Sequence, residues 1–226
     1  MRSDRGTILR CSVRWLSRRV LALARLLYKL EVQNFENLPH QGPLIILGRH
    51  SSRLDFVGTA FLSSAMEEFY GMTGAIAVHN NRFLGLLARQ LGVLTSFKVR
   101  GLSAASLMEA YKLLQQGKII FTGPEGEISW DGRLQPLRPG AAWLALRAHA
   151  PVVVLVGMGA YDIFPRWARR PHLTGKLVLR FGKPFYLCDA PCERVTEEML
   201  QEANRRVRAE MERLSDESLA SRDNVP

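Results

Sequence analysis

The chain has 226 residues, of which 47% are hydrophobic and 23% are charged, as in a folded domain with a substantial core. This composition argues against wholesale disorder. The three cysteines include no Cys-x-x-Cys pair, which argues against a disulfide framework and against a cysteine-rich zinc site. The formal net charge of +10 indicates an anionic partner, either nucleic acid or a lipid surface.

Most of the excess positive charge lies in the first 30 residues. This segment has eight arginines and lysines and one aspartate, whereas the rest of the chain has 23 basic and 20 acidic residues. We expect residues 1–34 to form a basic amphipathic helix ahead of a domain that spans residues 35–226. The expectation rests on leucines and valines at the spacing of one helical stripe, namely Leu9, Val13, Leu16, Val20, Leu23, Leu27 and Leu30.

A membrane surface is the partner that this helix fits best. Its longest unbroken apolar run has five residues, far short of the ~20 that cross a bilayer. A basic amphipathic helix with aromatic residues lies at the level of the lipid headgroups, so we predict that Arg14, Trp15 and Arg18 contact an anionic membrane. Two alternatives stay open: the leucine stripe packs on protein, or the arm binds nucleic acid. A cleavable signal peptide is disfavoured because Arg25 interrupts the apolar stretch.

Beyond the arm, short apolar runs alternate with segments of helical character. The runs predict strands at 43–47, 74–78, 93–99, 118–122, 152–156 and 177–181, and the segments between and after them predict helices at 53–69, 82–91, 103–116, 139–149 and 195–214. Strands that are apolar on both faces are covered on both faces. The predicted class is therefore α/β, with a mixed, mostly parallel central sheet, helices on both faces, and the basic amphipathic helix in front.

The first polar segment follows the strand at 43–47 and reads GRHSSRLDFVG, residues 48–58. Ser52 and Asp55 fit a helix-start pattern in which both side chains satisfy backbone amides, with His50 an incidental loop residue. A second interpretation makes His50 a general base and Asp55 the partner that orients it. With His50 in the loop and Asp55 in the first helical turn, the imidazole can fold back over the carboxylate, so the two interpretations are compatible.

A second polar segment, FTGPEGEISWDGRLQPLRPG at 121–140, also begins at a strand end, where α/β folds place ligands. We interpret Glu125 as a contact to a substrate or a brace for this loop, and the alternative is a solvent-exposed turn residue. The sequence has no nucleophile elbow, phosphate-binding loop or HExxH motif. Its five histidines do not cluster at ligand spacings, so no metal site is predicted.

The order of these segments resembles the glycerolipid acyltransferases, the 1-acylglycerol-3-phosphate acyltransferases and their relatives. The HxxxxD block of that family is matched by His50 and Asp55. Three further blocks are similar to residues 82–101, 123–129 and 150–158. The resemblance covers roughly residues 35–190, and the ordered set is more specific than any single block.

The resemblance implies transfer of a fatty acyl group from an acyl thioester to a hydroxyl of a lysolipid or glycerolipid, without an acyl-enzyme. It implies no bound cofactor, since acyl-CoA or acyl-carrier protein arrives as the donor substrate. The residues implied in substrate binding are Lys98, Arg100, Pro124, Glu125 and Gly126. In the third block the family usually has Thr-Arg where this chain has Glu127-Ile128. That arginine is thought to hold the acceptor's phosphate, so the acceptor headgroup stays open.

The predicted location is the cytoplasmic face of the cell membrane, as a peripheral protein whose lipid acceptor stays in the bilayer. The segment FPRWARRP at 164–171 mixes aromatic residues with arginines, so we expect Trp167 to form a second membrane contact; the alternative is an exposed basic loop. No nucleic-acid partner is expected. The competing function is a non-catalytic basic protein that kept the fold and binds membranes or nucleic acid.

Overall fold

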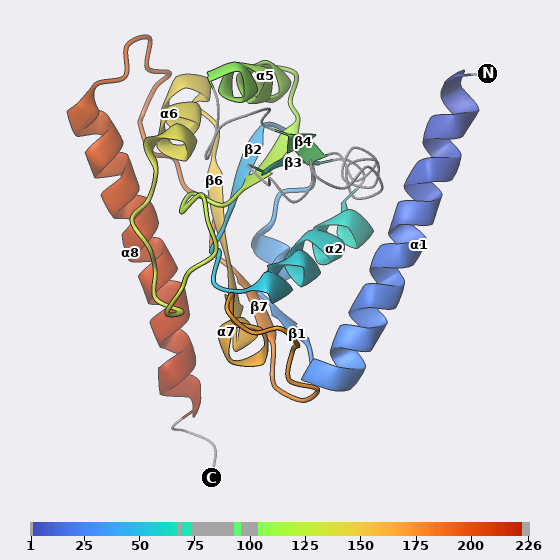
Figure 1. The fold of residues 1–226 in the computed structure, drawn as a ribbon. Coiled ribbons are helices and arrows are strands. Elements are labelled where there is room, and N and C mark those ends of the chain that lie inside the picture. Colours follow the sequence, from blue (N-terminus) through green and yellow to red (C-terminus); the bar gives the residue numbers. More distant parts are fainter. Residues whose placement is uncertain (1, 67–68, 74–92, 96–103, 223–226) are drawn as a thin grey trace.

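The computed structural model describes residues 2–66, 69–73, 93–95 and 104–222, and its centre is a seven-stranded sheet (Figure 1). The strands lie in the order β1-β7-β6-β2-β5-β3-β4. Neighbouring strands are parallel except β6 and β7, which run antiparallel. Their bounds are β1 Glu31–Gln33, β2 Leu44–Gly48, β3 Tyr70–Thr73, β4 Val93–Thr95, β5 Ile119–Thr122, β6 Val152–Met158 and β7 Val178–Phe181.

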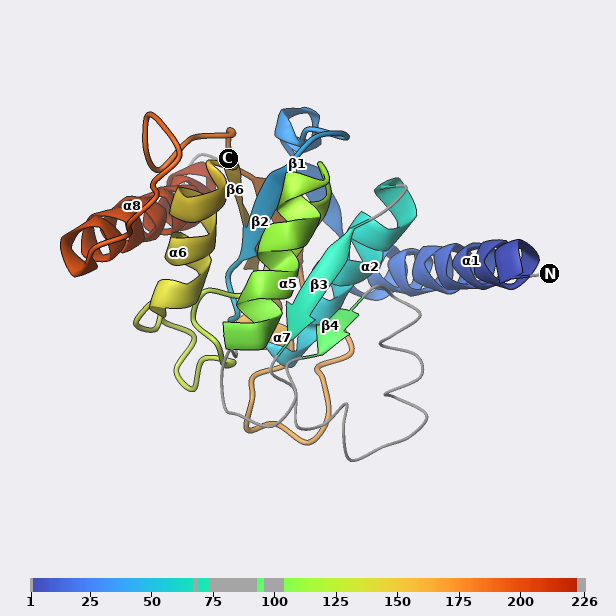
Figure 2. The same cartoon turned by 90° about the horizontal axis from the view of Figure 1, so that it is seen from above.

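Helices cover both faces of this sheet, so the predicted α/β class is confirmed. α6 and α8 lie on one side of the sheet, and α1 and α2 lie on the other (Figures 1 and 2). α5 packs against α6. The helices are α1 Arg2–Tyr28, α2 Phe56–Ala65, α5 Ala104–Gln115, α6 Pro139–Ala148, α7 Ala160–Ile163 and α8 Glu197–Arg222, with short 3-10 turns η1 Phe35–Asn37 and η2 Arg53–Asp55.

Alternate residues of β2 belong to two different cores. Ile45 and Leu47 pack with α5, α6 and α8, whereas Leu44 and Ile46 pack with α1 and α2. Successive side chains of a strand point to opposite faces, so a strand covered on both faces must be apolar throughout. This arrangement is why the continuous apolar runs of the sequence predicted the central strands.

The N-terminal helix packs on the body through a face that shares with the predicted leucine stripe only its end, where Leu27 packs on this core and Leu30 is buried. Leu21, Ala24 and Tyr28 are buried in the core that α1 shares with α2, whereas Leu16 and Leu23 are 42% and 55% exposed. The interpretation in which the helix packs on protein therefore holds for one face, and the opposite face stays exposed. In the part of the chain that the structure describes, no helix is long and apolar enough to cross a membrane.

Several predicted boundaries differ from the observed ones. The predicted helix 53–69 ends at Ala65, and residues 70–73 form β3, which the sequence analysis did not predict. β1 was also missed, because an edge strand of sequence EVQ contains only one apolar residue. The predicted strand 74–78 and the predicted helix 82–91 lie outside the described residues.

Candidate active site

The corner between β2 and η2 is built around Ser52 and Asp55. The Ser52 hydroxyl accepts the Leu54 amide at 2.9 Å, and Oδ2 of Asp55 accepts the Ser52 amide at 3.0 Å. This reciprocal pair is a capping box, and it fixes Asp55 in the first turn after the strand. The Ser52 hydroxyl also donates to the carbonyl of Phe164 at 2.6 Å, so it is fully used in the fold.

The same carboxylate oxygen of Asp55 meets the imidazole of His50. Nδ1 of His50 lies 2.8 Å from Oδ2 of Asp55, and the imidazole keeps 36% of its surface exposed. An ionised carboxylate only accepts hydrogen bonds, so Nδ1 is the donor and the lone pair of the neutral ring lies on Nε2. Burial raises the pKa of the Asp55 carboxyl above 3.8, and hydrogen bonds from His50 and Ser52 act in the opposite direction. The capping interpretation is confirmed, and the same carboxylate contacts the imidazole, while the role of His50 as a general base stays a prediction.

Glu125 braces the backbone on which His50 is carried. Its side chain is buried, with Oε2 accepting the His50 amide at 2.5 Å and Oε1 accepting the Gln135 amide at 3.0 Å. The Ser129 amide donates to the His50 carbonyl at 2.8 Å. The loop of the second polar segment therefore holds the peptide groups on both sides of His50. Burial raises the pKa of the Glu125 carboxyl, and the two backbone hydrogen bonds lower it. A solvent-exposed turn residue is the wrong interpretation of Glu125.

Arg49 is a functional candidate that the sequence analysis missed. Its guanidinium donates to the Ser215 hydroxyl of α8 at 2.9 Å and to the Gly132 carbonyl at 2.6 Å. Its charge lowers the pKa of both Asp55 and Glu125, against the effect of their burial. A cation directly before the histidine of the first polar segment is the signal that could have identified it.

Gly126 and Pro124 border a cleft next to His50 and Glu125. Gly126 has φ +74°, and a Cβ atom there would lie 2.5 Å from Nε of Arg138, so only glycine fits both the backbone and the packing. Arg138 is held in turn because its amide donates to the Pro124 carbonyl at 2.8 Å and its Nε to the Glu125 carbonyl at 3.3 Å.

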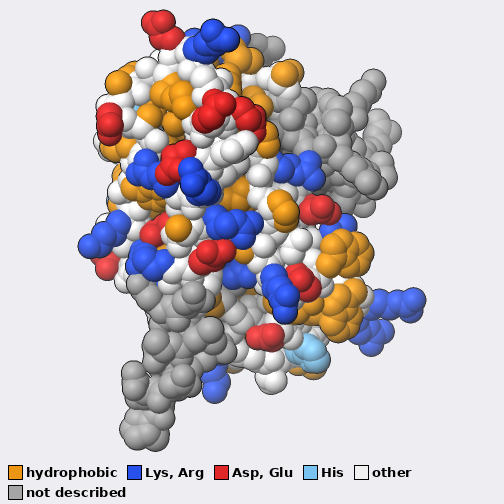
Figure 3. Space-filling view, turned by 90° about the vertical axis from the view of Figure 1, so that its left-hand side faces the viewer, with side chains coloured by type: hydrophobic (Ala, Val, Ile, Leu, Met, Phe, Trp, Pro, Cys, Tyr) orange, Lys and Arg blue, Asp and Glu red, His pale blue; other side chains and the backbone are white. Residues whose placement is uncertain are grey.

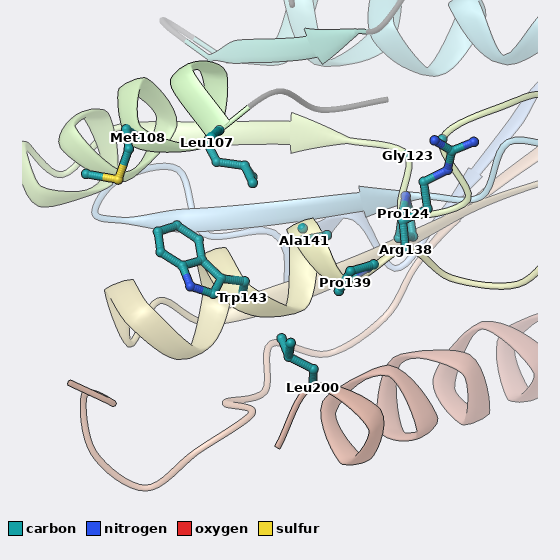
Figure 4. Close-up of a pocket in the computed structure, with 12 residues that line it drawn as sticks. Leu107, Met108, Gly123, Pro124, Arg138, Pro139, Ala141, Trp143 and Leu200 are labelled. Carbon is teal, nitrogen blue, oxygen red and sulfur yellow. The ribbon is translucent and has the colours of Figure 1, made fainter. Parts of the chain in front are cut away.

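The cleft has a volume of about 470 Å³ and is mostly apolar. Arg138 and Pro124 lie at one end of it, and Met108 and Trp143 lie at the other (Figure 4). A Cβ atom built on Gly123 would lie 3.7 Å from Cδ2 of His50, so the wall at the Arg138 end borders the imidazole. The lining residues are Ala104, Leu107, Met108, Gly123, Pro124, Gly126, Arg138, Pro139, Gly140, Ala141, Trp143 and Leu200.

The other predicted site residues differ in what the structure describes of them. Lys98 and Arg100 lie outside the described residues. Arg14 is half-buried and donates to the Met66 carbonyl at 3.0 Å, and its role as a membrane contact stays a prediction. Trp15 and Trp167 are exposed, as a membrane contact requires. Among the described residues, no group of three histidine, cysteine or acidic side chains could hold a metal ion.

A family model described as Acyltransferase matches residues 29–157, more than half of the chain. The chain belongs to the acyltransferase family. This confirms the resemblance seen in the sequence, and the matched segment includes His50, Asp55 and Glu125.

Relatives of this acyltransferase carry more specific names. The chain is 29% identical over 180 residues to the chloroplastic 1-acyl-sn-glycerol-3-phosphate acyltransferase BAT2 of Brassica napus, covering 76% of this chain and 51% of that protein. It is 29% identical over 161 residues to 1-acyl-sn-glycerol-3-phosphate acyltransferase alpha of Bos taurus, covering 69% of this chain and 54% of that one. The chain thus spans about half the length of these curated relatives.

The fold is also similar to that of a solved structure. The crystal structure of the 1-acyl-sn-glycerophosphate (LPA) acyltransferase PlsC from Thermotoga maritima matches with a TM-score of 0.69 and 20% sequence identity. The match covers 95% of this chain and 83% of that chain. At this identity the likeness establishes a shared fold.

Proposed function

We propose that this acyltransferase moves a fatty acyl group from an acyl thioester to a hydroxyl group of a lysolipid or glycerolipid, with His50 as the general base. The observation that carries the proposal is the 2.8 Å contact between His50 Nδ1 and Asp55 Oδ2 at the edge of an apolar cleft. A histidine oriented through one ring nitrogen presents the other to a reacting proton.

The reaction proceeds in two steps. Nε2 of His50 takes the proton of the acceptor hydroxyl while its oxygen attacks the thioester carbonyl, and Asp55 stabilises the imidazolium that forms. The tetrahedral intermediate then expels the thiolate, which takes the proton back from His50. No acyl-enzyme is needed because the thioester is already activated. The nearby Ser52 hydroxyl is used in two hydrogen bonds of the fold, which fits its absence from the chemistry.

The apolar cleft supports a fatty chain as the group that is transferred. Its length runs from the border of His50 at Gly123 to Trp143 and Met108, so a chain lying in it would carry its carbonyl at the imidazole. The donor is acyl-CoA or acyl-carrier protein, and the enzyme holds no cofactor of its own.

The acceptor class follows from the relatives, whose names specify 1-acyl-sn-glycerol-3-phosphate. We propose that the acceptor is a monoacylated glycerolipid, and a panel of lysolipids with different headgroups identifies which one. Ile128 stands where the family usually has an arginine, and Glu127 before it forms an ion pair with Arg166 at 2.9 Å. These residues favour a headgroup contact different from the usual one.

We propose that the protein works as a peripheral protein at the cytoplasmic face of the cell membrane, with residues 1–34 as its membrane arm and residues 35–226 as its catalytic domain. Water-soluble thioesters reach it from the cytosol, and the acceptor stays in the bilayer. The exposed face of α1 supports this proposal, since it carries Trp15, Leu23 and Leu26 together with the exposed Arg18.

The test is a thiol-release assay with long-chain acyl-CoA and the lysolipid panel. We expect His50→Ala to reduce kcat by about 10²–10⁴-fold, the usual contribution of a general base. Asp55→Asn should also reduce kcat, with the fold checked by circular dichroism. Full activity of the His50→Ala protein would end the mechanism. A wild-type chain that binds vesicles but releases no thiol with any acceptor would instead support the non-catalytic alternative.

A further inference from the structure

Three of the four tryptophans are more than half exposed, and two of them lie together beside the active site. Trp130 is 60% exposed and Trp167 is 64% exposed. Tyr161 connects them, because its hydroxyl donates to the Trp130 carbonyl at 2.8 Å and accepts Nε1 of Trp167 at 3.3 Å. Tryptophan is usually well buried in soluble proteins, so two linked and exposed indoles indicate a contact surface.

Arg166 completes this surface and fixes it. Its guanidinium stacks over the Trp130 ring at 4.1 Å from the ring centre. It also pairs with Glu127 and donates to the Ile128 carbonyl, both at 2.9 Å. We call Trp130, Tyr161, Arg166 and Trp167 the tryptophan platform. Its side chains are held by hydrogen bonds and stacking, so little freedom is lost when a partner covers them.

The two loops that carry the platform are hydrogen-bonded to the segment from His50 to Arg53. The loop that carries Trp130 donates the Ser129 amide to the His50 carbonyl at 2.8 Å. The loop that carries Arg166 and Trp167 supplies the Phe164 carbonyl, which accepts the Ser52 hydroxyl at 2.6 Å and the Arg53 amide at 3.2 Å. A partner that covers the platform therefore contacts loops that are hydrogen-bonded to the segment carrying the His50 imidazole.

The chemistry of the platform and its border fits a lipid–water interface. An indole places its apolar body among lipid chains and its N–H near the headgroups, which is why tryptophan collects at membrane interfaces. The segment 166–176 has three arginines and one lysine and no acidic residue, and Arg169, Arg170 and Leu173 in it are exposed. Figure 3 shows one face of the molecule, where hydrophobic side chains gather near one edge with both basic and acidic side chains beside them.

We infer that the tryptophan platform docks the active-site loops on the surface of an anionic bilayer, so that an acceptor hydroxyl can reach His50 without leaving the membrane. The inference rests on the proposed function, and it adds a contact surface separate from α1. In this arrangement the indoles enter the interface while the arginines of residues 166–170 meet lipid phosphates.

Fluorescence gives the direct test. A Trp15→Phe, Trp143→Phe variant keeps only the two platform indoles. We expect their emission to shift to the blue with vesicles of phosphatidylcholine and phosphatidylglycerol, and brominated lipids of the same composition to quench it. Emission that is unchanged by saturating vesicles overturns the inference.

A Trp130→Ala, Trp167→Ala variant tests the consequence for activity, with Tyr186→Ala as the control for loss of an exposed aromatic residue elsewhere. We expect at least a fivefold loss of vesicle binding and of the rate on a vesicle-embedded acceptor, whereas the rate on a dispersed short-chain acceptor stays within twofold. Equal losses on both acceptors, unchanged vesicle binding, or a loss confined to DNA binding each overturn the inference. Failure of the proposed function looks different: the wild-type chain would then release no thiol with any acceptor, and the fluorescence test would still report on the platform.

Discussion

At the scale of single residues, His50 is fixed at three points. Its amide donates to Glu125, its carbonyl accepts the Ser129 amide, and its Nδ1 donates to Asp55. Positioning of this kind lowers a barrier because the reacting group does not have to be ordered during the reaction. Because Nδ1 contacts Asp55, Nε2 is the ring nitrogen that the proposed base would use.

Glu125→Gln tests the brace. A glutamine side chain keeps one carbonyl oxygen, so one of the two backbone amides, of His50 or of Gln135, loses its acceptor. We expect the free energy of unfolding to fall by about 1–3 kcal/mol, the usual cost of an unpaired buried polar group. Because the displaced peptide carries His50, kcat should fall more than KM changes. Urea titration and steady-state kinetics measure the two effects.

The matched control for the brace is Glu127→Gln, in the same loop. Glu127 is half exposed and its ion pair with Arg166 lies at the surface, so its loss should cost no more than about 1 kcal/mol. An unchanged kcat in the Glu125→Gln protein would show that the brace has no role in positioning His50.

Arg49→Gln tests the charge balance of the two buried carboxyls. The guanidinium lowers the pKa of Asp55 and of Glu125, so its removal raises both. The proposed base needs ionised Asp55, and we therefore expect the acid limb of the kcat/KM profile to move to higher pH. Arg49→Lys keeps the charge and should move the limb less.

Ser215→Ala separates the effect of the Arg49 charge from the effect of the hydrogen bond that anchors Arg49 to α8. The substitution removes the hydroxyl that accepts Arg49 at 2.9 Å and donates to the Met211 carbonyl at 2.7 Å, and the cation stays. We expect a stability loss of about 0.5–1.5 kcal/mol and no movement of the acid limb. An acid limb at the same pH in the wild-type and Arg49→Gln proteins would leave Arg49 a purely structural residue.

The site could be predicted from the sequence where its contacting residues are close in the chain, and not where they are far apart. His50 and Asp55 are five residues apart, so helix-start chemistry predicted their geometry locally. The brace joins Glu125 to His50 across 75 residues, and Arg49 reaches Ser215 across 166. Contacts of this range depend on which strands lie side by side, and the order β6-β2-β5 was not readable from local patterns.

At the scale of elements, the three central strands β2, β5 and β6 were predicted, whereas β1 at one edge and β3 inside the sheet were not. β2, β5 and β6 are covered on both faces and have continuous apolar runs, which is a strong signal. β1 is an edge strand of three residues, and its position comes from its pairing with β7. The N-terminal helix shows a second limit: periodicity predicted a stripe through Leu16 and Leu23, whereas the buried face of the helix carries Leu21, Ala24 and Tyr28.

We expect substitutions on the two faces of α1 to have opposite effects on stability and on vesicle binding. Leu21 is buried against α2, so Leu21→Ala should lower the free energy of unfolding by about 2–5 kcal/mol and leave vesicle binding intact. Leu26 is 79% exposed, so Leu26→Ser should change stability by no more than about 0.5 kcal/mol and weaken vesicle binding. Thermal unfolding and vesicle sedimentation measure the pair. Deleting residues 1–30 would mix the two effects, because it also removes core residues.

At the scale of the whole molecule, positive charge and exposed tryptophans occur at two places, the N-terminal helix and the loops beside the active site. The net charge is +10, and the segment 166–176 has no acidic residue. Two contacts on one rigid body bind a surface more tightly than either alone if both can reach it at once. Trp15 on α1 and the tryptophan platform would then share one bilayer, with the active site between lipid and water.

Salt separates the role of the membrane from the chemistry. Exposed charges are screened over about 8 Å at 0.15 M salt and over about 3 Å at 1 M, and each lysine or arginine near an anionic membrane contributes about 1 kcal/mol at most. We expect binding to anionic vesicles to weaken by about tenfold or more between 0.05 and 0.5 M salt. The rate on a dispersed acceptor should change less than about twofold, because the His50–Asp55 contact is partly buried and short. Binding that is independent of salt would mean that apolar contacts alone hold the protein at the bilayer and that the basic residues serve another partner.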